Sequence, residues 1–231
     1  VDIFGQCDDD FLQANSIEKG VMTILDAAGS ARLYAALGKI GSPQLISGGS
    51  AANTAVGVAA FGGSANFIGR VLDYDLDAAF RHDIKADGVC LYLPPASSGS
   101  PTASSIILVT PDAARSMNTF LGASIEFEAG DLALADAASA KIIYLEGYLF
   151  DAPNGPAIFA EAAHLAEKHD VRLALSLSDP WCAERHRAAL SSFIADHISI
   201  LFGNEEEVAS LYQSSSQDAI AALAGKIDEL V

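Results

Sequence analysis

The sequence of 231 residues is 51% hydrophobic and 19% charged, which is typical of a folded globular protein with a sizeable core. Its 30 acidic and 13 basic residues give a formal net charge of −17, which argues against nucleic acids and anionic membranes as partners, because both reward clustered lysine and arginine. The three cysteines are far apart and form no Cys-x-x-Cys pair, which argues against a disulfide framework or a zinc site. No apolar run approaches the roughly 20 residues of a membrane-spanning helix, and no signal sequence opens the chain. We therefore expect a cytoplasmic protein.

Both ends of the sequence fall inside strand-like runs. Val1 is not a start residue, and the segment from Val1 to Phe4 resembles the end of an apolar strand that includes Asp2. The sequence then stops at Val231 just as another apolar run begins. We therefore expect the natural protein to extend beyond this sequence.

The first half of the chain has irregularly spaced strand-like runs around a glycine-rich helix. Strands are predicted at residues 21–25, 89–93, 105–110 and 116–121. Turn residues, Pro111 and Asp112, separate the last two runs, which predicts a hairpin.

The stretch from Gly48 to Gly62, GGSAANTAVGVAAFG, joins a double glycine to a helix of small apolar residues. Gly48 and Gly49 would let the backbone approach a ligand closely, and the free N–H groups that open the helix would offer donors. Asn53 would lie in the first helical turn, with an amide that donates and accepts hydrogen bonds to hydroxyls. A tight turn before a closely packed helix would need the same residues, so this stretch alone leaves both interpretations open.

From residue 140 onward, apolar runs alternate regularly with helical patterns. Strands are predicted at 141–145, 171–177 and 198–202, and helices at 156–168 and 184–194. This alternation predicts βαβ units and a parallel sheet covered by helices. A loop follows the second strand, and in it Trp181 is expected to pack rather than to stack on a ligand.

The segment Asn204 to Glu207 follows the third of these strands and opens another helix. Asparagine is a good N-cap, and glutamate in the first turn suits the helix dipole. A structural role alone would therefore explain this segment when it is considered by itself.

In order and separation, the stretch at 48–62 and the segment at 204–207 together resemble the signatures of the PfkB family of carbohydrate and nucleoside kinases. The segment from Gly69 to Asp73 also resembles the family's GxVGxD strand end, except that Leu72 stands where the pattern has glycine. The resemblance covers nearly the whole chain.

The resemblance implies an α/β, ribokinase-like fold with a mainly parallel sheet flanked by helices and a small β-strand lid. It implies one domain over residues 1–231, incomplete at both ends, with lid segments at about 6–45 and 90–122. Closing such a lid over the substrate would exclude water, which would otherwise accept the phosphoryl group.

The resemblance also implies a substrate site. Asp2 matches the family aspartate that accepts hydrogen bonds from sugar hydroxyls, and Gly48, Gly49 and Asn53 would complete the sugar platform. Glu146 matches a position where ribokinases place a carboxylate near the sugar. A solvated strand-end carboxylate at Asp2 and a loop ion pair at Glu146 stay open as alternatives.

For ATP and Mg²⁺, the resemblance points to two other places in the chain. Asn204 and Glu207 match the family's N-x-x-E, whose carboxylate acts mainly through water on the magnesium ion. Arg115 opens a segment similar to the lid strand of adenosine kinases, where the arginine approaches the phosphates; a solvated lid arginine is the alternative. Potassium activation, known in parts of the family, depends on loops outside this sequence.

No catalytic residue is assigned in this chain. The family's catalytic aspartate lies in a later GAGD loop, which this sequence does not contain. The sequence also lacks a Walker A motif, an H-E-x-x-H motif and the final glycine of a nucleophile elbow, and its five histidines are expected at the surface.

The resemblance therefore implies ATP-dependent phosphorylation of a sugar or nucleoside hydroxyl, with an adenosine kinase-like activity expected first. The lid strand favours a nucleoside, whereas Glu146 favours ribose or another free sugar. The alternatives are a ribokinase- or fructokinase-like sugar kinase, and a non-catalytic sugar- or nucleoside-binding protein if the chain is truly this short. PfkB lids cover their own site or form a dimer clasp, so a homodimer through the lid is a further expectation.

Overall fold

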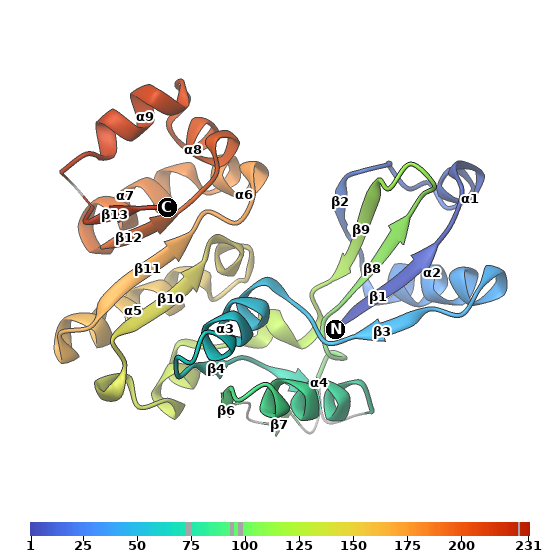
Figure 1. The fold of residues 1–231 in the computed structure, drawn as a ribbon, viewed down its shortest axis with the longest axis horizontal. Helices are drawn as coiled ribbons and strands as arrows, with labels where there is room; N and C mark the ends of the chain where they lie inside the picture. Colours follow the sequence, from blue (N-terminus) through green and yellow to red (C-terminus); the bar gives the residue numbers. More distant parts are fainter. Residues whose placement is uncertain (73–74, 93–94, 97–98, 226) are drawn as a thin grey trace. The chain divides into compact units, whose positions relative to one another are not determined.

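A computed structural model of the chain describes residues 1–72, 75–92, 95–96, 99–225 and 227–231. The chain divides into two compact units, Val1–Glu126 and Phe127–Val231. Each unit has a β-sheet and helices of its own (Figure 1). The single domain with a lid, inferred from the sequence, stays a prediction.

The first unit is built on a five-stranded sheet. In spatial order its strands are β2 (Met22–Ile24), β9 (Arg115–Phe120), β8 (Ser104–Val109), β1 (Asp2–Gln6) and β3 (Gln44–Ile46). The predicted hairpin is confirmed: β8 and β9 pair antiparallel, and across the turn the Thr110 N–H donates to the Ala114 carbonyl at 3.1 Å. β1 pairs parallel with β8 and antiparallel with β3, which fixes the position of Asp2.

Two helices bury alternate residues of this sheet. α1 (Asp9–Ala14) and α2 (Ala27–Ile40) begin at aspartate N-caps, where Asp8 accepts from the Phe11 N–H and Asp26 from the Gly29 N–H. The core between these helices and the sheet consists of Ile3, Leu12, Leu33, Leu37, Ile106 and Leu108. Because successive side chains of a strand point to opposite faces, Asp2 and Phe4 of β1 face away from this core.

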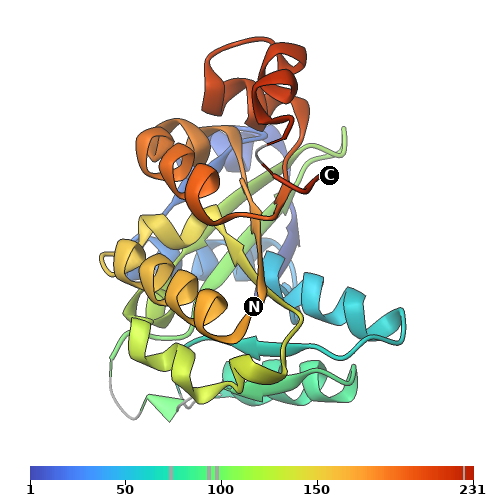
Figure 2. The ribbon, with the colours of Figure 1, turned by 90° about the vertical axis from the view of Figure 1, so that its left-hand side faces the viewer.

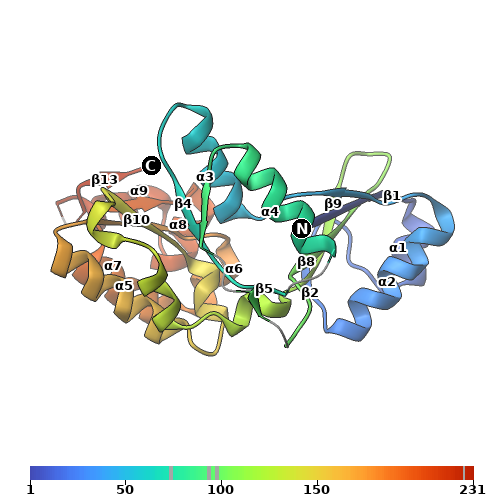
Figure 3. The ribbon, with the colours of Figure 1, turned by 90° about the horizontal axis from the view of Figure 1, so that it is seen from below.

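The rest of the first unit consists of two helices, two pairs of strands and a short 3₁₀ segment (Figure 3), and these elements enclose a second apolar core. Its helices are α3 (Ser50–Ala60) and α4 (Asp75–Ala86), and a short 3₁₀ segment (Gly122–Glu126) closes the unit. Its strands form two parallel pairs, β4 (Asn66–Ile68) with β6 (Cys90–Tyr92), and β5 (Val71–Leu72) with β7 (Pro95–Ala96). The core residues are Ala52, Val71, Phe80, Ile84 and Val89.

The structure accommodates Leu72, where the family pattern has glycine. Leu72 is 6% exposed, and its backbone is not among those with positive φ, the conformation that favours glycine. Its N–H donates to the Thr102 hydroxyl at 3.0 Å. The backbone here therefore does not need the glycine of the pattern. Asp73, the last residue of the segment from Gly69 to Asp73, lies outside the described residues.

The second unit contains a parallel sheet, as the alternating pattern predicts. The order is β10 (Ile142–Glu146), β11 (Arg172–Ser176), β12 (Ile200–Phe202) and β13 (Glu229–Leu230), with every neighbouring pair parallel. Helices flank the sheet (Figure 2). The edge-to-face contact of Phe159 with Phe193 joins α5 (Gly155–His169) to α7 (Arg187–His197) at a centroid distance of 4.8 Å. Leu173, Leu175 and Leu201 are fully buried in the strands.

Other helices in this unit follow strands or precede them. They are α6 (Pro180–Arg185), α8 (Glu205–Tyr212) and α9 (Ser216–Leu223), with 3₁₀ segments at 129–134, 137–139 and 147–151. The single helix predicted at 184–194 is wrong, because α6 ends and α7 begins around His186. The backbone of His186 leaves the helical conformation, and its Nε2 lies 2.7 Å from Asp151 Oδ1. His186 is also half-buried, which differs from the expected surface histidine.

Candidate functional site

The double glycine of the first unit forms a turn that touches Asp2. Asp2 of β1 pairs with Ile46 of β3, two residues before Gly48. Gly48 is buried, and a Cβ atom built on it would overlap the Asp2 carboxylate. Gly49 is exposed and has a φ of 112°, a conformation that favours glycine. The structure thus places Gly48 against the predicted aspartate, and the positive φ of Gly49 explains why glycine suits the next position.

α3 begins at this turn. Gly49 is its N-cap, and the Asn53 N–H donates to the Gly49 carbonyl at 2.9 Å, which places Asn53 in the first turns of the helix as predicted. The Asn53 side chain is exposed. Its amide therefore lies on the solvent side of a helix whose start is fixed next to Asp2.

Burial alters the acidity of Asp2. The side chain is half-buried, and loss of water raises the pKa of its carboxyl group above the ordinary value. A carboxylate that has lost part of its hydration gains from hydroxyl donors that a ligand brings. This environment suits an acceptor of hydrogen bonds from sugar hydroxyls.

The face of the sheet that carries Asp2 also carries hydroxyl groups that the sequence analysis did not single out. Ser105 of β8 lies beside Asp2 in register, and Thr119 of β9 lies beside Ser105. Their hydroxyl oxygens are 3.0 Å apart. Cross-strand register, which no local pattern contains, is the signal that finds this polar row.

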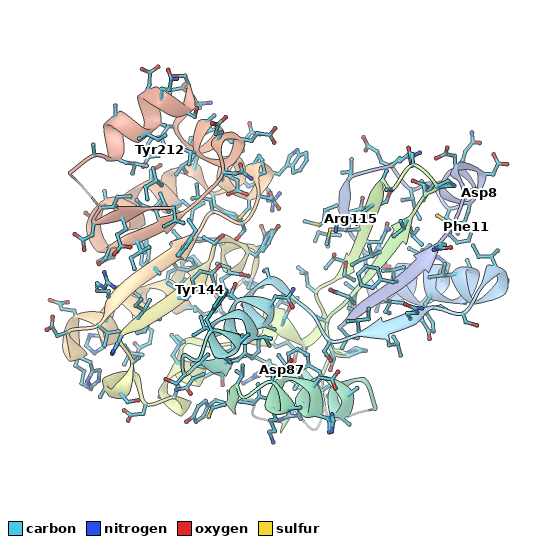
Figure 4. The ribbon with its side chains drawn as sticks, viewed as in Figure 1. Asp8, Phe11, Asp87, Arg115, Tyr144 and Tyr212 are labelled. Carbon is cyan, nitrogen blue, oxygen red and sulfur yellow. The ribbon has the colours of Figure 1, made fainter. Side chains whose placement is uncertain are left out.

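Arg115 lies on the same face as Asp2 but farther along the sheet. It pairs with Val109, at the start of β9, and it is exposed (Figure 4). Thr119 is four positions farther along the chain, a distance of roughly 13 Å along the strand. The structure therefore does not bring Arg115 against Asp2.

In the second unit, the predicted Asn204 and Glu207 form a capping box at the start of α8. Asn204 Oδ1 accepts from the Glu207 N–H at 2.9 Å, and Glu207 Oε2 accepts from the Asn204 N–H at 3.1 Å. The Asn204 amide also donates to Glu207 Oε1 at 3.0 Å. The N-cap interpretation of this segment is confirmed, and it leaves Glu207 held in one orientation.

Glu207 is 9% exposed and has a second carboxylate nearby. Burial raises the pKa of its carboxyl group, the hydrogen bond from the Asn204 N–H opposes this rise, and the charges of Asp179 and Glu206 add to it. Asp179 follows β11 and caps α6, because its Oδ1 accepts from the Cys182 N–H at 2.6 Å. Asp179 was not predicted as a site residue. The signal that finds it is its place just after a parallel strand, where such sheets bind ligands.

The charge of Asp179 also affects the pKa values of two neighbouring side chains, Tyr148 and Cys182. Burial and the charge of Asp179 raise the pKa of the Tyr148 phenol, and burial with nearby carboxylates raises the pKa of the Cys182 thiol to about 12. Both groups therefore stay neutral at physiological pH. Trp181 follows Asp179 closely and is 56% exposed, so the expectation that it packs is wrong.

Glu146 lies at the same edge of the second sheet as Asp179. It ends β10, is paired in register with Ser176, and is half-buried. The hydroxyl of Tyr144, a residue labelled in Figure 4, donates to Glu146 Oε1 at 3.3 Å. Because carboxyl ends of parallel strands meet at one edge, Glu146, Asp179 and the Asn204–Glu207 box gather along that edge.

The donor set at this edge suits a magnesium ion with a largely aqueous shell. Asp179 and Glu207 offer carboxylate oxygens, the hard ligands that Mg²⁺ prefers, and a cation would relieve their repulsion. Among the described residues, no three His, Cys, Asp or Glu side chains gather closely enough to hold a metal on their own. Mg²⁺ commonly keeps several waters and takes one or two carboxylates together with substrate phosphates, so two carboxylates fit it.

Within the described part of the chain, no helix is both long and apolar enough to cross a membrane.

Comparison with known proteins identifies the family. Residues 22–231 match the family described as pfkB family carbohydrate kinase. The chain belongs to the PfkB family. The sequence-based recognition of this family, and of its ribokinase-like α/β fold, is thus confirmed.

Solved structures of similar proteins agree with this family assignment. An adenosine kinase from Sinorhizobium meliloti is 39% identical, with a TM-score of 0.88 over 98% of this chain and 69% of that chain. A "probable sugar kinase protein" from Rhizobium etli CFN 42 is 38% identical, with a TM-score of 0.88 over 98% of this chain and 68% of that one. An adenosine kinase from Anopheles gambiae shares the fold. It is 21% identical, and the match has a TM-score of 0.82 over 100% of this chain and 77% of that one. PfkB membership supports a sugar or nucleoside phosphotransferase, and it leaves the substrate to be determined.

Proposed function

We propose that the protein transfers the γ-phosphoryl group of ATP to a hydroxyl of a nucleoside, in the manner of an adenosine kinase. The observation that carries the proposal is the contact between the Asp2 carboxylate and the Gly48–Gly49 turn at the start of α3. This contact places a poorly hydrated acceptor beside backbone that has no side chains, which suits the hydroxyl-bearing edge of a sugar.

In this proposal, residues of the first unit bind and cover the substrate. Asp2 accepts hydrogen bonds from the sugar hydroxyls, and the Gly48–Gly49 turn lets the sugar approach the backbone. Asn53 adds an amide that donates and accepts. The face of the five-stranded sheet that carries Asp2 covers the substrate and excludes water, and Arg115 approaches the phosphates. No residue of this chain is assigned as the base.

Residues of the second unit would hold Mg²⁺. Glu207, fixed by Asn204, and Asp179 would contact the ion through its waters. When bound, Mg²⁺ neutralises charge on the transferring phosphates. Potassium dependence, a homodimer through the lid and a cytoplasmic location all stay predictions for this protein.

Phosphorylation of a free sugar is the second candidate function. It is favoured by the half-buried Glu146, which matches a sugar-binding position of ribokinases. The 39% identity to an adenosine kinase and the 38% identity to a probable sugar kinase do not separate the two candidates. The lid strand from Arg115 to Gly122 favours the nucleoside.

Calorimetric titration of the chain with adenosine, ribose and fructose tests the proposal, with ADP release measured in parallel. We expect adenosine to bind and the two sugars not to bind, and we expect the variant Asp2→Asn to lose most of the adenosine affinity. Asp87→Asn, which changes an exposed carboxylate after α4, is the matched control and should bind like the wild type. If ribose or fructose binds and adenosine does not, the result would favour the second candidate function, phosphorylation of a free sugar. Adenosine binding without ADP release would leave a nucleoside-binding protein.

A further inference from the structure

We propose that Asp83 is a positioning residue for the Gly48–Gly49 turn, acting through the hydroxyl of Ser47. The proposal rests on the function proposed above, because it concerns the turn assigned there to the substrate.

The contact joins two elements that are distant in sequence. Ser47, the residue between β3 and Gly48, donates its hydroxyl to Asp83 Oδ2 at 2.5 Å. Asp83 lies in α4, and its other carboxylate oxygen, Oδ1, lies 3.2 Å from His82 Nδ1. The Ser47 hydroxyl and then His82 hold the pKa of the Asp83 carboxyl below its ordinary value. The acceptor therefore stays ionised at neutral pH, and hydrogen bonds to a charged acceptor are the stronger ones.

α4 is a firm anchor for this bond. Phe80 and Ile84, on either side of Asp83 in the helix, are 5% and 2% exposed. They share an apolar core with Ala52 of α3, the helix that the turn opens. The bond from Ser47 to Asp83 therefore connects the start of the turn to α4, and α4 shares its apolar core with α3, the helix at the end of the turn.

The turn needs such a connection because its own residues restrain it weakly. Gly48 and Gly49 have no side chains, and glycine has more backbone freedom to lose than any other residue. β3, the strand before the turn, is an edge strand whose residues Gln44 to Ile46 are all exposed. A turn fixed before the substrate arrives would lose less entropy on binding.

Loss of the Ser47 hydroxyl should therefore weaken substrate binding and loosen the turn. For Ser47→Ala we expect adenosine affinity to fall about two- to tenfold, the effect of one hydrogen bond. Ser47→Thr keeps the hydroxyl and should restore the affinity. Asp83→Ala should match Ser47→Ala, and the double variant should be no weaker than either single variant, because all three remove the same bond.

The experiment combines calorimetry with adenosine and hydrogen–deuterium exchange of peptides covering residues 44–53. Ser192→Ala is the matched control, since it removes an exposed serine–aspartate bond of 3.3 Å to Asp196 in the second unit. Faster exchange at the turn and weaker binding in Ser47→Ala, both reversed in Ser47→Thr and absent from Ser192→Ala, would support the proposal. A general loss of stability would instead appear as faster exchange in peptides far from the turn.

Three results would overturn the proposal. They are unchanged exchange and affinity in Ser47→Ala, failure of threonine to restore them, and additive losses in the double variant. If the wild type binds neither adenosine nor a sugar, the proposed function fails. Exchange at the turn would then still decide whether Asp83 orders it through Ser47.

Discussion

Gly48, in the turn before α3, and Gly57, inside α3, should differ in their tolerance of a side chain. Gly48→Ala would drive a Cβ atom into the Asp2 carboxylate, so we expect a stability cost of ~1–3 kcal/mol and a loss of adenosine affinity of about tenfold or more. Gly57→Ala, in the interior of α3 with no atom within 4 Å of the new Cβ, should stabilise the protein by ~0.5–1 kcal/mol and leave the affinity unchanged. Urea denaturation and calorimetry measure both quantities. Wild-type affinity in Gly48→Ala would contradict the assigned role of the turn.

At the residue scale, the local hydrogen bonds of the candidate site could be predicted from the sequence, whereas the register of its strands could not. The types of Asn204 and Glu207 were sufficient to predict a cap, and the capping box has that geometry. The contact of Asp2 with Gly48 depends on the pairing of β1 with β3, and the row through Ser105 and Thr119 depends on further pairing. The pairings of Asp2 with Ile46 and with Ser105 join residues about 40 and 100 positions apart, beyond the reach of periodicity, whereas Ser105 and Thr119 face each other within one hairpin.

An ion-pair cluster connects α1, the following loop and the tip of the β8–β9 hairpin. Lys19 lies 2.7 Å from Asp9 and 2.8 Å from Asp112. Bonds from Lys19, Thr110 and the Ala114 N–H hold the pKa of Asp112 well below its ordinary value. A carboxyl whose pKa is lowered on folding contributes stability above the pKa of the unfolded chain, about 3.8, and that contribution is lost as pH falls through the folded-state pKa.

Asp112→Asn should therefore lower the melting temperature at pH 7, and the difference from the wild type should shrink progressively below about pH 4. Melting curves followed by circular dichroism between pH 7 and pH 2 measure this difference. Asp87→Asn, with an exposed carboxylate after α4, provides the comparison and should melt like the wild type at pH 7. A difference that grows with acidification would contradict the assigned direction.

At the element scale, the regular second half of the chain was predicted better than the first. Strands and helices that alternate along a parallel sheet leave period and length signals that are easy to recognise. The break between α6 and α7 was missed because the helical pattern runs on across His186, whose contact with Asp151, 35 residues away, leaves no local signal. In the first half, strands of two or three residues such as β3, β5 and β7 are too short to carry a periodic signal.

The whole molecule is strongly acidic, with a formal charge of −17. Repulsion among these charges disfavours the compact state, and salt screens it, because the Debye length falls from about 30 Å at 0.01 M to about 8 Å at 0.15 M. We expect the melting temperature to rise when sodium chloride is raised over this range. Tetramethylammonium chloride should give a similar rise, which would separate screening from specific cation binding. A lower melting temperature in both salts would contradict this view.

At this scale, composition and family resemblance together predicted the class of fold, and the single domain with a lid stays a prediction. The apolar fraction indicates that a core forms, and it contains no information on the number of cores. Two apolar clusters in the first unit and a separate parallel sheet in the second arise from the pairing of particular strands.

The exposed Trp181 has an optical consequence, since it is the single tryptophan of the chain. Indole fluorescence of this protein comes from one place, two residues after Asp179, at the carboxyl edge of the parallel sheet. A water-facing indole is open to collisional quenchers, and its emission responds to nearby charge. The intrinsic fluorescence of Trp181 can therefore report on the edge of the sheet where magnesium is proposed to bind, without an attached dye.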